Sequence, residues 1–453
     1  MNFTLRAVAL RKSAKQKLHI KMQVERLKSL PAWSWSIATN AINLVIGIAT
    51  GILVARLLGP AARGELAEVQ YWAAAVAAMG ICSLPSALSF FIARQPQQES
   101  IAGSALTLAA ILALISVIVG LILIGTFVPP GLRNLTMLYL VVFIPANFVG
   151  LTLVAIDQGN QHFVRYNVFR LLPQTTYLVC TVLLWQKSAI AVPALLAASW
   201  CGSFLVCLGR WRLLGANAIQ VPEPKRMKEL FQTGLAFHAT AFAGILFQNA
   251  DRLICIAYFT HADLGKYAVA LTMSGAGLGL VSSATSIVLF PKLAAARSLS
   301  SCRHLIRNAL GSSFVVALCI NIAIALILPV LLPLLFGAAF ADAVPVATLL
   351  CIAQIPASFV QIAALALRAL DDWRAGPYAQ VLALVVFVPV AATLIPRLGI
   401  NGIAMSLLSS NLAAAVLVLR RLYRKIGLNA FQCLTPEIGW VRSQLTWRSV
   451  GTV

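Results

Sequence analysis

Twelve apolar segments, each about 20 residues long and separated by short polar loops, follow one another between residues 34 and 420. A helix of about 20 apolar residues spans the hydrocarbon core of a bilayer. Backbone N–H and C=O groups find no partners in lipid, so segments that cross it must be helical or form a closed barrel. Only 11% of the 453 residues are charged, which leaves little of the chain for a domain in water. The sequence therefore predicts an all-α polytopic membrane protein with about twelve transmembrane helices.

Basic residues predict the orientation of these helices, because cytoplasmic loops of membrane proteins collect Lys and Arg. With the N-terminus inside, 28 of the 35 Lys and Arg residues lie on the cytoplasmic side and 7 on the other. Both termini are therefore expected in the cytoplasm. The expected spans are residues 34–57, 70–93, 105–128, 135–157, 167–186, 189–210, 233–257, 267–290, 311–336, 343–368, 375–396 and 400–420.

The net charge of +22 has two interpretations. A soluble chain with this charge would be a candidate for binding nucleic acid. In a chain of membrane spans the positive-inside rule explains the same charge, so no nucleic-acid partner is expected. Residues 1–30 hold eight Lys and Arg and predict a basic cytoplasmic tail. The tail could be an interfacial helix on anionic lipids or a solvated segment.

The chain contains an internal repeat. Ile144-Pro-Ala-Asn-Phe-Val149 in the fourth span returns as Ile355-Pro-Ala-Ser-Phe-Val360 in the tenth, at an offset of 211. Gly64-Glu-Leu-Ala67 matches Gly265-Lys-Tyr-Ala268 at an offset of 201. Six spans per copy is an even number, so both copies enter the membrane in the same direction, as in transporters built from parallel repeats.

The repeat predicts two six-helix lobes with a substrate site between them. The expected divisions are the tail at 1–30, the lobes at 31–220 and 221–425, and a cytoplasmic tail at 426–453. Pro145 and Pro356 lie near the middle of equivalent spans. Proline removes a backbone hydrogen bond and kinks a helix, so these two residues are candidate hinges, or prolines merely tolerated in membrane helices.

Polar residues form matched stripes on the first span of each half. Asn40, Asn43, Gly47 and Thr50 share one helical face of span one, and Thr240, Gly244, Gln248 and Asp251 share one face of span seven. At the offset of 201, Asn43 corresponds to Gly244, Gly47 to Gln248 and Thr50 to Asp251. Both stripes are expected to line a cavity between the lobes. Helix packing is the alternative, because it favours the same small and polar residues.

Charged residues within or beside the spans are the other candidates for the site. Asp251 and Arg252 lie near the outer end of span seven and need partners from elsewhere, for which Arg56 and Arg63 are candidates. Arg165, Arg170 and Arg368 border the cytoplasmic mouth, where their planar guanidinium groups suit a phosphate. The positive-inside rule is the simpler explanation for this second group. No nucleotide or metal motif is present, and no cofactor is expected.

Several short motifs resemble one family. The run ARLLGPAARGELA at Ala55–Ala67 resembles the corresponding stretch of polysaccharide flippases, which transport lipid-linked oligosaccharides and belong to the multidrug, oligosaccharidyl-lipid and polysaccharide exporter superfamily. QNADRL at Gln248–Leu253, GKYAV at Gly265–Val269, and QGNQ with Tyr166-Asn167 after the fourth span are similar to further segments of that family. Thr260-His-Ala departs from it, because a turn containing glycine is usual there.

The resemblance implies a flippase of the cytoplasmic membrane for undecaprenyl-pyrophosphate-linked units. The head group would enter a cationic cavity from the cytoplasm while the polyprenyl tail stays in lipid, and the lobes would rock. Other proteins of polysaccharide assembly are possible partners. One alternative is a cation-coupled multidrug exporter, although Asp251 is the single plausible buried carboxylate for coupling. A membrane glycan polymerase or ligase is disfavoured by the short outer loops and by the repeat.

Overall fold

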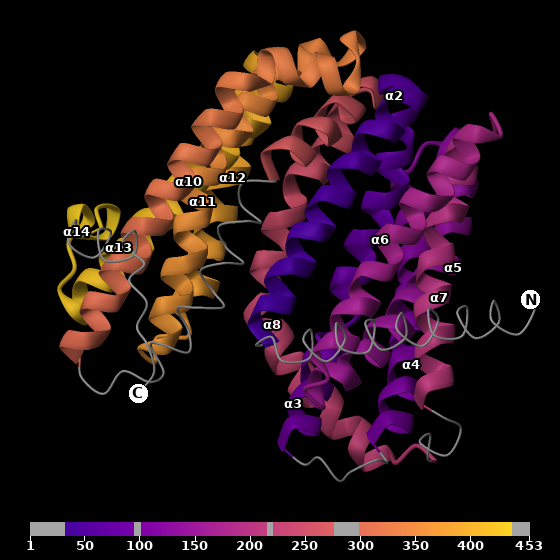
Figure 1. Ribbon diagram of the computed structural model, residues 1–453, viewed down its shortest axis with the longest axis horizontal. Coiled ribbons are helices and arrows are strands. Elements are labelled where there is room, and N and C mark those ends of the chain that lie inside the picture. The colour runs from indigo at the N-terminus through magenta and orange to yellow at the C-terminus, as the bar shows by residue number, and fades with distance from the viewer. Residues whose placement is uncertain (1–31, 95–100, 215–220, 276–298, 437–453) are drawn as a thin grey trace, which may run out of the picture.

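The computed structural model describes residues 32–94, 101–214, 221–275 and 299–436 (Figure 1). These residues form helices and loops and contain no strand. The basic tail at 1–30, the eighth span beyond residue 275 and residues 437–453 lie outside the described part of the chain. The elements are α2 (Ala32–Gly80), α3 (Leu84–Arg94), α4 (Ile101–Phe127), α5 (Pro130–Gly159), α6 (Phe163–Gln186), α7 (Val192–Leu214), α8 (Pro224–Tyr258), α10 (Leu299–Phe336), the 3₁₀ helix η2 (Ala338–Ala343), α11 (Val344–Ala369), α12 (Ala375–Leu398), α13 (Ile400–Ile426) and α14 (Ala430–Leu434).

The helices account for the twelve predicted spans. Ten described helices are long and apolar enough to cross a membrane. One of them, α2, contains the first span and the start of the second, and the second is continued by α3. The helical residues 261–275 begin the eighth span. The prediction of an all-helical membrane protein with about twelve spans is confirmed, while the placement of both termini in the cytoplasm stays a prediction.

A sharp bend at Gly59 separates the first two spans within α2. Gly59 has φ of 70° and ψ of 177°, a conformation that side chains with a Cβ rarely adopt. Pro60 follows, and proline suits the first turn of a helix because no N–H is needed there. The bend turns the chain back into the membrane and places residues 60–68 at one end of the molecule. We call this end, which also holds residues 259–266 and 337–343, the outer end, following the predicted orientation.

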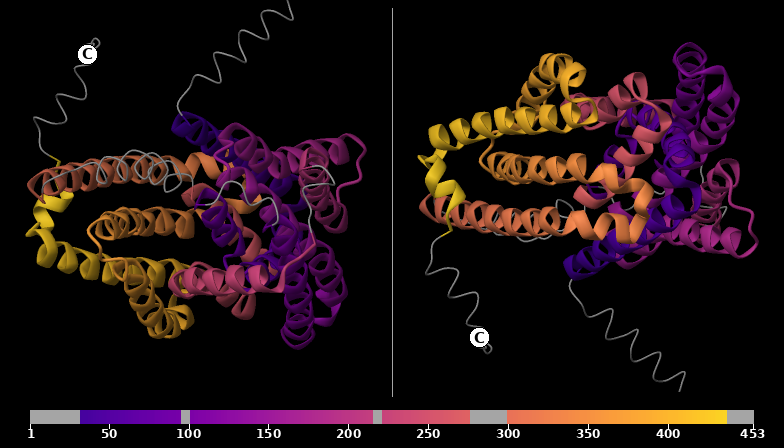
Figure 2. Two further views of the ribbon diagram at one scale, coloured as in Figure 1. Left: turned by 90° about the horizontal axis from the view of Figure 1, so that it is seen from below. Right: turned by 90° about the horizontal axis from the view of Figure 1, so that it is seen from above.

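The helices form two groups that correspond to the two copies of the repeat. Buried apolar residues of α2 to α7 make one core that runs from Val54 to Leu230. A second core runs from Ala55 to Cys433 and is built mainly from α8, residues 261–275 and α10 to α14. Views from the two ends show the groups side by side (Figure 2). The division of the chain at residue 220 is a sequence prediction and stays one.

Helix α8 contacts both groups. Near its start, the ring of Phe237 packs edge-on against Phe90 of α3, with centroids 5.8 Å apart. Further along, Phe247 packs against Phe387 of α12 with centroids 6.1 Å apart. The first part of α8 therefore packs on the N-terminal group and its second part on the C-terminal group.

The two candidate hinge prolines lie inside uninterrupted helices. Pro145 belongs to α5 and is exposed, whereas Pro356 belongs to α11 and is buried. The two prolines thus differ in burial, although their sequence positions are equivalent. A role for either residue as a hinge remains a proposal.

Candidate functional site

The two groups meet at the outer end through a pair of equivalent contacts. A Cβ on Gly64 would overlap the backbone carbonyl of His261, and a Cβ on Gly265 would overlap the carbonyl of Pro60. Pro60 and His261 are separated by the same offset of 201 as Gly64 and Gly265. Each copy of the repeat therefore makes the same contact with the other. This reciprocity is the property of a two-fold interface, here within one chain.

Three polar contacts surround this outer closure. Nε2 of His261 lies 2.9 Å from Oε2 of Glu68, whose side chain is buried. Nζ of Lys266 donates to Oδ2 of Asp342 at 2.7 Å. The Arg56 guanidinium donates from Nε to the carbonyl of Leu335 at 2.6 Å and from Nη2 to that of Leu334, near the end of α10. These contacts hold the outer ends of α2 and of the C-terminal helices together.

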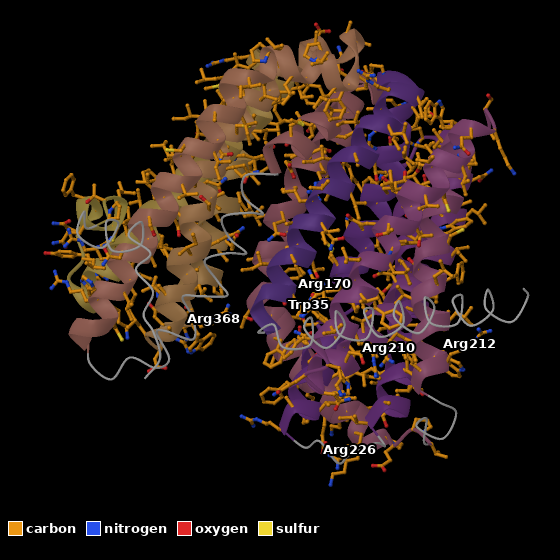
Figure 3. The ribbon with its side chains drawn as sticks, viewed as in Figure 1. Trp35, Arg170, Arg210, Arg212, Arg226 and Arg368 are labelled. Atoms are coloured by element: carbon orange, nitrogen blue, oxygen red, sulfur yellow. The ribbon has the colours of Figure 1, made fainter. Side chains whose placement is uncertain are left out.

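The helix groups diverge away from the outer end (Figure 1). Arg170 of α6 and Arg368 of α11 lie at a similar level along the helices, on different groups (Figure 3). Nη2 of Arg170 donates to the side-chain oxygen of Asn40 at 3.3 Å, and Arg368 is exposed. Guanidinium groups are therefore present on both groups where the two no longer pack together.

The stripe on α2 borders two cavities in the N-terminal group. Asn43 lines a cavity of about 280 Å³ together with Arg170 and Gln174 of α6. Its side-chain oxygen is buried and has no hydrogen-bond partner. Gly47 and Thr50 line a second cavity of about 170 Å³, to which Gln174 also contributes. Three of the four residues of the stripe, Asn43, Gly47 and Thr50, thus border cavities.

The stripe on α8 lies elsewhere. Gln248 is exposed, and neither it nor Asp251 borders these two cavities. Asp251 is 5% exposed and accepts a hydrogen bond of 2.7 Å from the Tyr267 hydroxyl, within its own group. The expectation that Arg56 would pair with Asp251 is corrected by this geometry, because the Arg56 guanidinium is bound to carbonyls of α10.

Two further predicted arginines of the outer half lie near the cavities and the closure. The guanidinium of Arg252 lies over the ring of Tyr71, 5.2 Å from its centroid, a cation–π contact between the groups. Arg63 lines the smaller cavity, and its Nε is buried without a hydrogen-bond partner.

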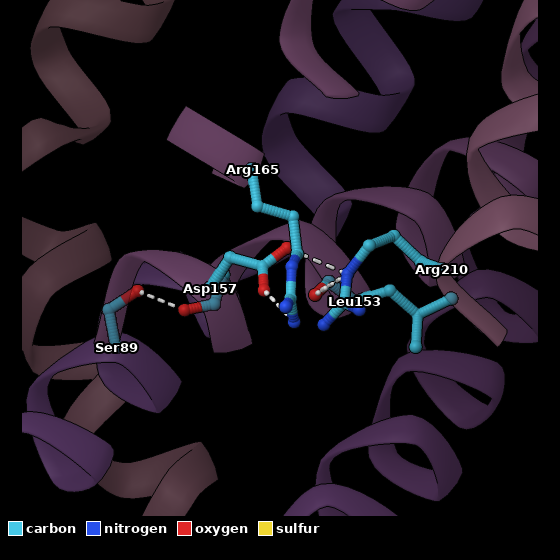
Figure 4. A network of polar contacts seen from close by, with 6 residues as sticks. Ser89, Leu153, Asp157, Arg165 and Arg210 are labelled. Carbon is cyan, nitrogen blue, oxygen red and sulfur yellow. Dashed lines mark hydrogen bonds and ion pairs between the residues drawn. The ribbon is translucent and has the colours of Figure 1, made fainter. Parts of the chain in front are cut away.

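Arg165 belongs to a cluster of charges at the inner end of the N-terminal group (Figure 4). Asp157 lies 2.8 Å from Nε of Arg210 and 3.6 Å from Nη1 of Arg165. Asp157 and Arg210 are each 1% exposed, and Arg210 lies over the ring of Phe169. The cluster joins the end of α5 to the end of α7, so its primary effect is structural.

The C-terminal group contains a counterpart of this cluster. Arg421, at an offset of 211 from Arg210, donates to both carboxylate oxygens of Asp372 at 2.9 and 3.0 Å. Its guanidinium lies over the ring of Tyr378. An Asp–Arg pair therefore joins the fourth span to the sixth in one copy and the loop after the tenth span to the twelfth span in the other.

Sequence reasoning missed the partners in these contacts. Tyr267, Glu68, His261, Asp157 and Arg210 were not among the candidates. The offsets of the repeat were the usable signal for the glycine contacts, which recur at 201 residues, and for the arginines of the Asp–Arg pairs, which recur at 211. In the described part of the chain, no group of three or more His, Cys, Asp and Glu side chains is arranged to hold a metal ion.

Comparison with known proteins finds one family model and several solved structures with a similar fold. Residues 29–297 match the model of a family described as polysaccharide biosynthesis protein. Among solved structures, an inward-facing multidrug resistance MATE family transporter of the MOP superfamily has a TM-score of 0.68 and 16% identity, covering 86% of this chain and 94% of the other. The lipid II flippase MurJ in an inward closed conformation also has a TM-score of 0.68, with 13% identity, covering 91% and 93%.

A third similar structure is a MOP superfamily transporter from Pyrococcus furiosus, with a TM-score of 0.62 and 16% identity, covering 86% of this chain and 95% of the other. No curated protein sequence matches the chain significantly. These identities are low, so the structural likeness establishes a shared fold.

Proposed function

The chain belongs to the polysaccharide biosynthesis protein family, and from this premise we propose that it is a flippase for polyprenyl-pyrophosphate-linked oligosaccharide units in the cytoplasmic membrane. It is a multi-pass membrane protein with a MOP-superfamily transporter fold. One solved structure with this fold is that of a lipid II flippase, a protein named for a lipid-linked substrate. Family and fold thus support transport in polysaccharide biosynthesis.

The observation that carries the proposal is that the two helix groups make reciprocal contacts at the outer end and diverge towards the opposite end. Gly64 and Gly265 let two backbones touch, so closure there is close-packed. Arg170 and Arg368 lie where the groups diverge. A pyrophosphate has two negatively charged groups, which the planar fork of arginine binds through paired hydrogen bonds. The head group would enter there, and parting of the outer contacts would release it on the other side.

A cation-coupled exporter of the MATE type is the second candidate. It is supported by the similar MATE structures and by Asp251, a buried carboxylate whose Oδ1 has no hydrogen-bond partner. An exporter of this kind needs a carboxylate that binds and releases a cation. The two candidates predict different substrates, and the phenotype of a strain that lacks the gene distinguishes them.

Deletion of the gene tests the proposal. We expect surface polysaccharide to be lost and lipid-linked units to accumulate on the cytoplasmic leaflet, because the units can no longer cross. Surface polysaccharide is measured by blotting. The leaflet that holds the lipid-linked units is identified by whether a glycan-modifying enzyme reaches them in oriented vesicles. Normal surface polysaccharide, in a strain that encodes no second flippase, combined with increased drug sensitivity would instead favour the exporter.

Arg170 provides a residue-level prediction. Arg170→Ala is expected to weaken binding of the lipid-linked unit by roughly 10- to 100-fold, because a hydrogen bond to a charged group contributes about 1.5–3 kcal/mol. Arg170→Lys should recover only part of this loss, since lysine lacks the planar fork. Binding is measured with the purified protein and extracted units. Arg212→Ala removes an exposed positive charge from α7 and should bind normally; equal losses in both variants would assign the effect to charge alone.

A further inference from the structure

The smaller cavity lies below the outer closure and has both polar and apolar lining residues, the latter including Val54. Gly47, Thr50 and Gly51 of α2 form one side, and Gln174 and Tyr177 of α6 form another. Arg63 and Gln70 border it from the second half of α2, and Thr272 is the one lining residue from the described part of the C-terminal half. Its volume is about 170 Å³, which suits a single sugar ring better than a whole oligosaccharide.

The positions that line this cavity carry different residues in the second repeat. At the offset of 201, Gly47 and Gly51 correspond to Gln248 and Arg252, whose side chains are much larger. Arg252 extends across to the ring of Tyr71, which is the counterpart of Thr272. Thr272 in turn lies beside Gly51, and a Cβ added at Gly51 would come within 3.2 Å of the Thr272 methyl group. The pairs are equivalent, and the small residues of the first repeat leave space between α2 and α6.

Four of the polar lining residues have apolar counterparts in the second repeat. Arg63 and Gln70 correspond to Leu264 and Leu271, which are a buried member of the C-terminal core and a residue packed against it. Gln174 and Tyr177 correspond, at the offset of 211, to Val385 and Val388, both exposed apolar residues of α12. Four polar positions in one repeat are thus apolar in the other. Helix packing alone does not require this difference, since the second repeat packs with leucine and valine.

The polar groups of the lining suit a sugar, because all of them except the Arg63 guanidinium are neutral. Two side-chain amides and a phenol can donate and accept, and the hydroxyls of Thr50 and Thr272, which donate to carbonyls of their own helices, can accept. A sugar ring carries several hydroxyl groups that both donate and accept. Buried polar groups discriminate strongly against ligands that leave them unpaired. A pocket of this kind can therefore select one sugar from another.

We propose that this cavity, which we call the sugar pocket, binds a sugar ring of the transported unit and determines which glycan is accepted. The inference rests on the proposed flippase function. Gln174 lines both the sugar pocket and the larger cavity that contains Arg170. Arg170 and Tyr177 are seven residues apart on α6, which is about 10 Å along a helix. A pyrophosphate at Arg170 therefore leaves an attached sugar within reach of the sugar pocket.

Protection of introduced cysteines tests the proposal. In a background without the nine native cysteines, Gly47→Cys places a thiol in the sugar pocket and Asn43→Cys places one in the cavity with Arg170. A Cβ at Gly47 has its nearest neighbour at 3.7 Å, so the substitution fits. Reaction with a membrane-impermeant thiol reagent is timed in inside-out vesicles. The two probes are lipid-linked units extracted from the deletion strain and polyprenyl pyrophosphate without sugar.

The lipid-linked units should slow labelling at both positions, by about tenfold at ten times their Kd, because the unoccupied fraction falls by that factor. Polyprenyl pyrophosphate should slow labelling of Asn43→Cys alone. Protection of Gly47→Cys by polyprenyl pyrophosphate would make the pocket a phosphate site and overturn the proposal. Protection of Asn43→Cys alone by the full unit would also overturn it while leaving the flippase function intact. Protection at neither position, with no transport of the units, would reject the flippase function itself.

Discussion

Gly64→Leu is expected to prevent closure of the outer end and to abolish transport. A side chain at Gly64 overlaps the carbonyl oxygen of His261, and a backbone atom cannot move aside as a flexible side chain can. Overpacking of this kind costs about 1–3 kcal/mol in the closed state alone. A penalty of that size shifts a two-state equilibrium by roughly 5- to 150-fold toward the state with the outer end open. A transporter held in one state cannot complete its cycle.

Spin labels at Ala61 and Tyr258, both exposed at the outer end, measure this shift. We expect their distance distribution to move to longer distances in Gly64→Leu. Gly265→Leu should give the same result, because Gly265 makes the equivalent contact with Pro60. Gly131→Leu is the matched control, since a Cβ there meets no atom within 4 Å. Unchanged distances and normal transport in both closure variants would show that the outer closure is not required.

Asp157→Asn is expected to cause the largest loss of stability among single substitutions of charged residues. Asp157 and Arg210 are both buried, and removing one partner of a buried ion pair costs about 3–5 kcal/mol because the other charge is left unpaired. Asp372→Asn removes the counterpart pair, whose side chains are 15% and 29% exposed. Water can replace the lost partner there, so we expect a smaller loss of about 1 kcal/mol.

Unfolding of the purified protein in detergent gives the free energies of unfolding. The double variant Asp157→Leu with Arg210→Met should be more stable than Asp157→Asn, because replacing both partners by apolar groups avoids an unpaired buried charge. Equal stability of the wild type, Asp157→Asn and Asp372→Asn would show that the Asp–Arg pairs do not stabilise the packing of the segments that they join.

Hydropathy alone was sufficient to predict the helical elements of this protein. Apolar runs of spanning length must form helices in lipid, because no other open structure satisfies the backbone. The predicted spans at 105–128 and 135–157 accordingly correspond to α4 and α5. The bend at Gly59 was not predicted, although Gly59-Pro60 is a recognisable break, because hydropathy does not report backbone conformation.

The repeat was predicted from two short matches, and it turned out to describe contacts as well as topology. Gly64 and Gly265 were identified only as matching letters at an offset of 201. In the folded chain Gly64 touches His261 and Gly265 touches Pro60. Pro60 and His261 are themselves equivalent positions of the repeat. A repeat with an even number of spans relates its copies by rotation, so equivalent positions meet near the rotation axis.

The sequence by itself determined which residues are in helices, how many spans there are and which segments are equivalent, because these depend on local composition and periodicity. Only the tertiary structure decided the partners. Asp251 is bound to Tyr267, Arg56 to carbonyls of α10, and Glu68 to His261. Each pairing depends on how separate helices cross, and helical periodicity states which face a residue occupies but not what lies opposite. The sugar pocket has the same origin: Gly47 and Gly51 are small residues in the sequence, and they border a cavity because α6 and Thr272 happen to face them.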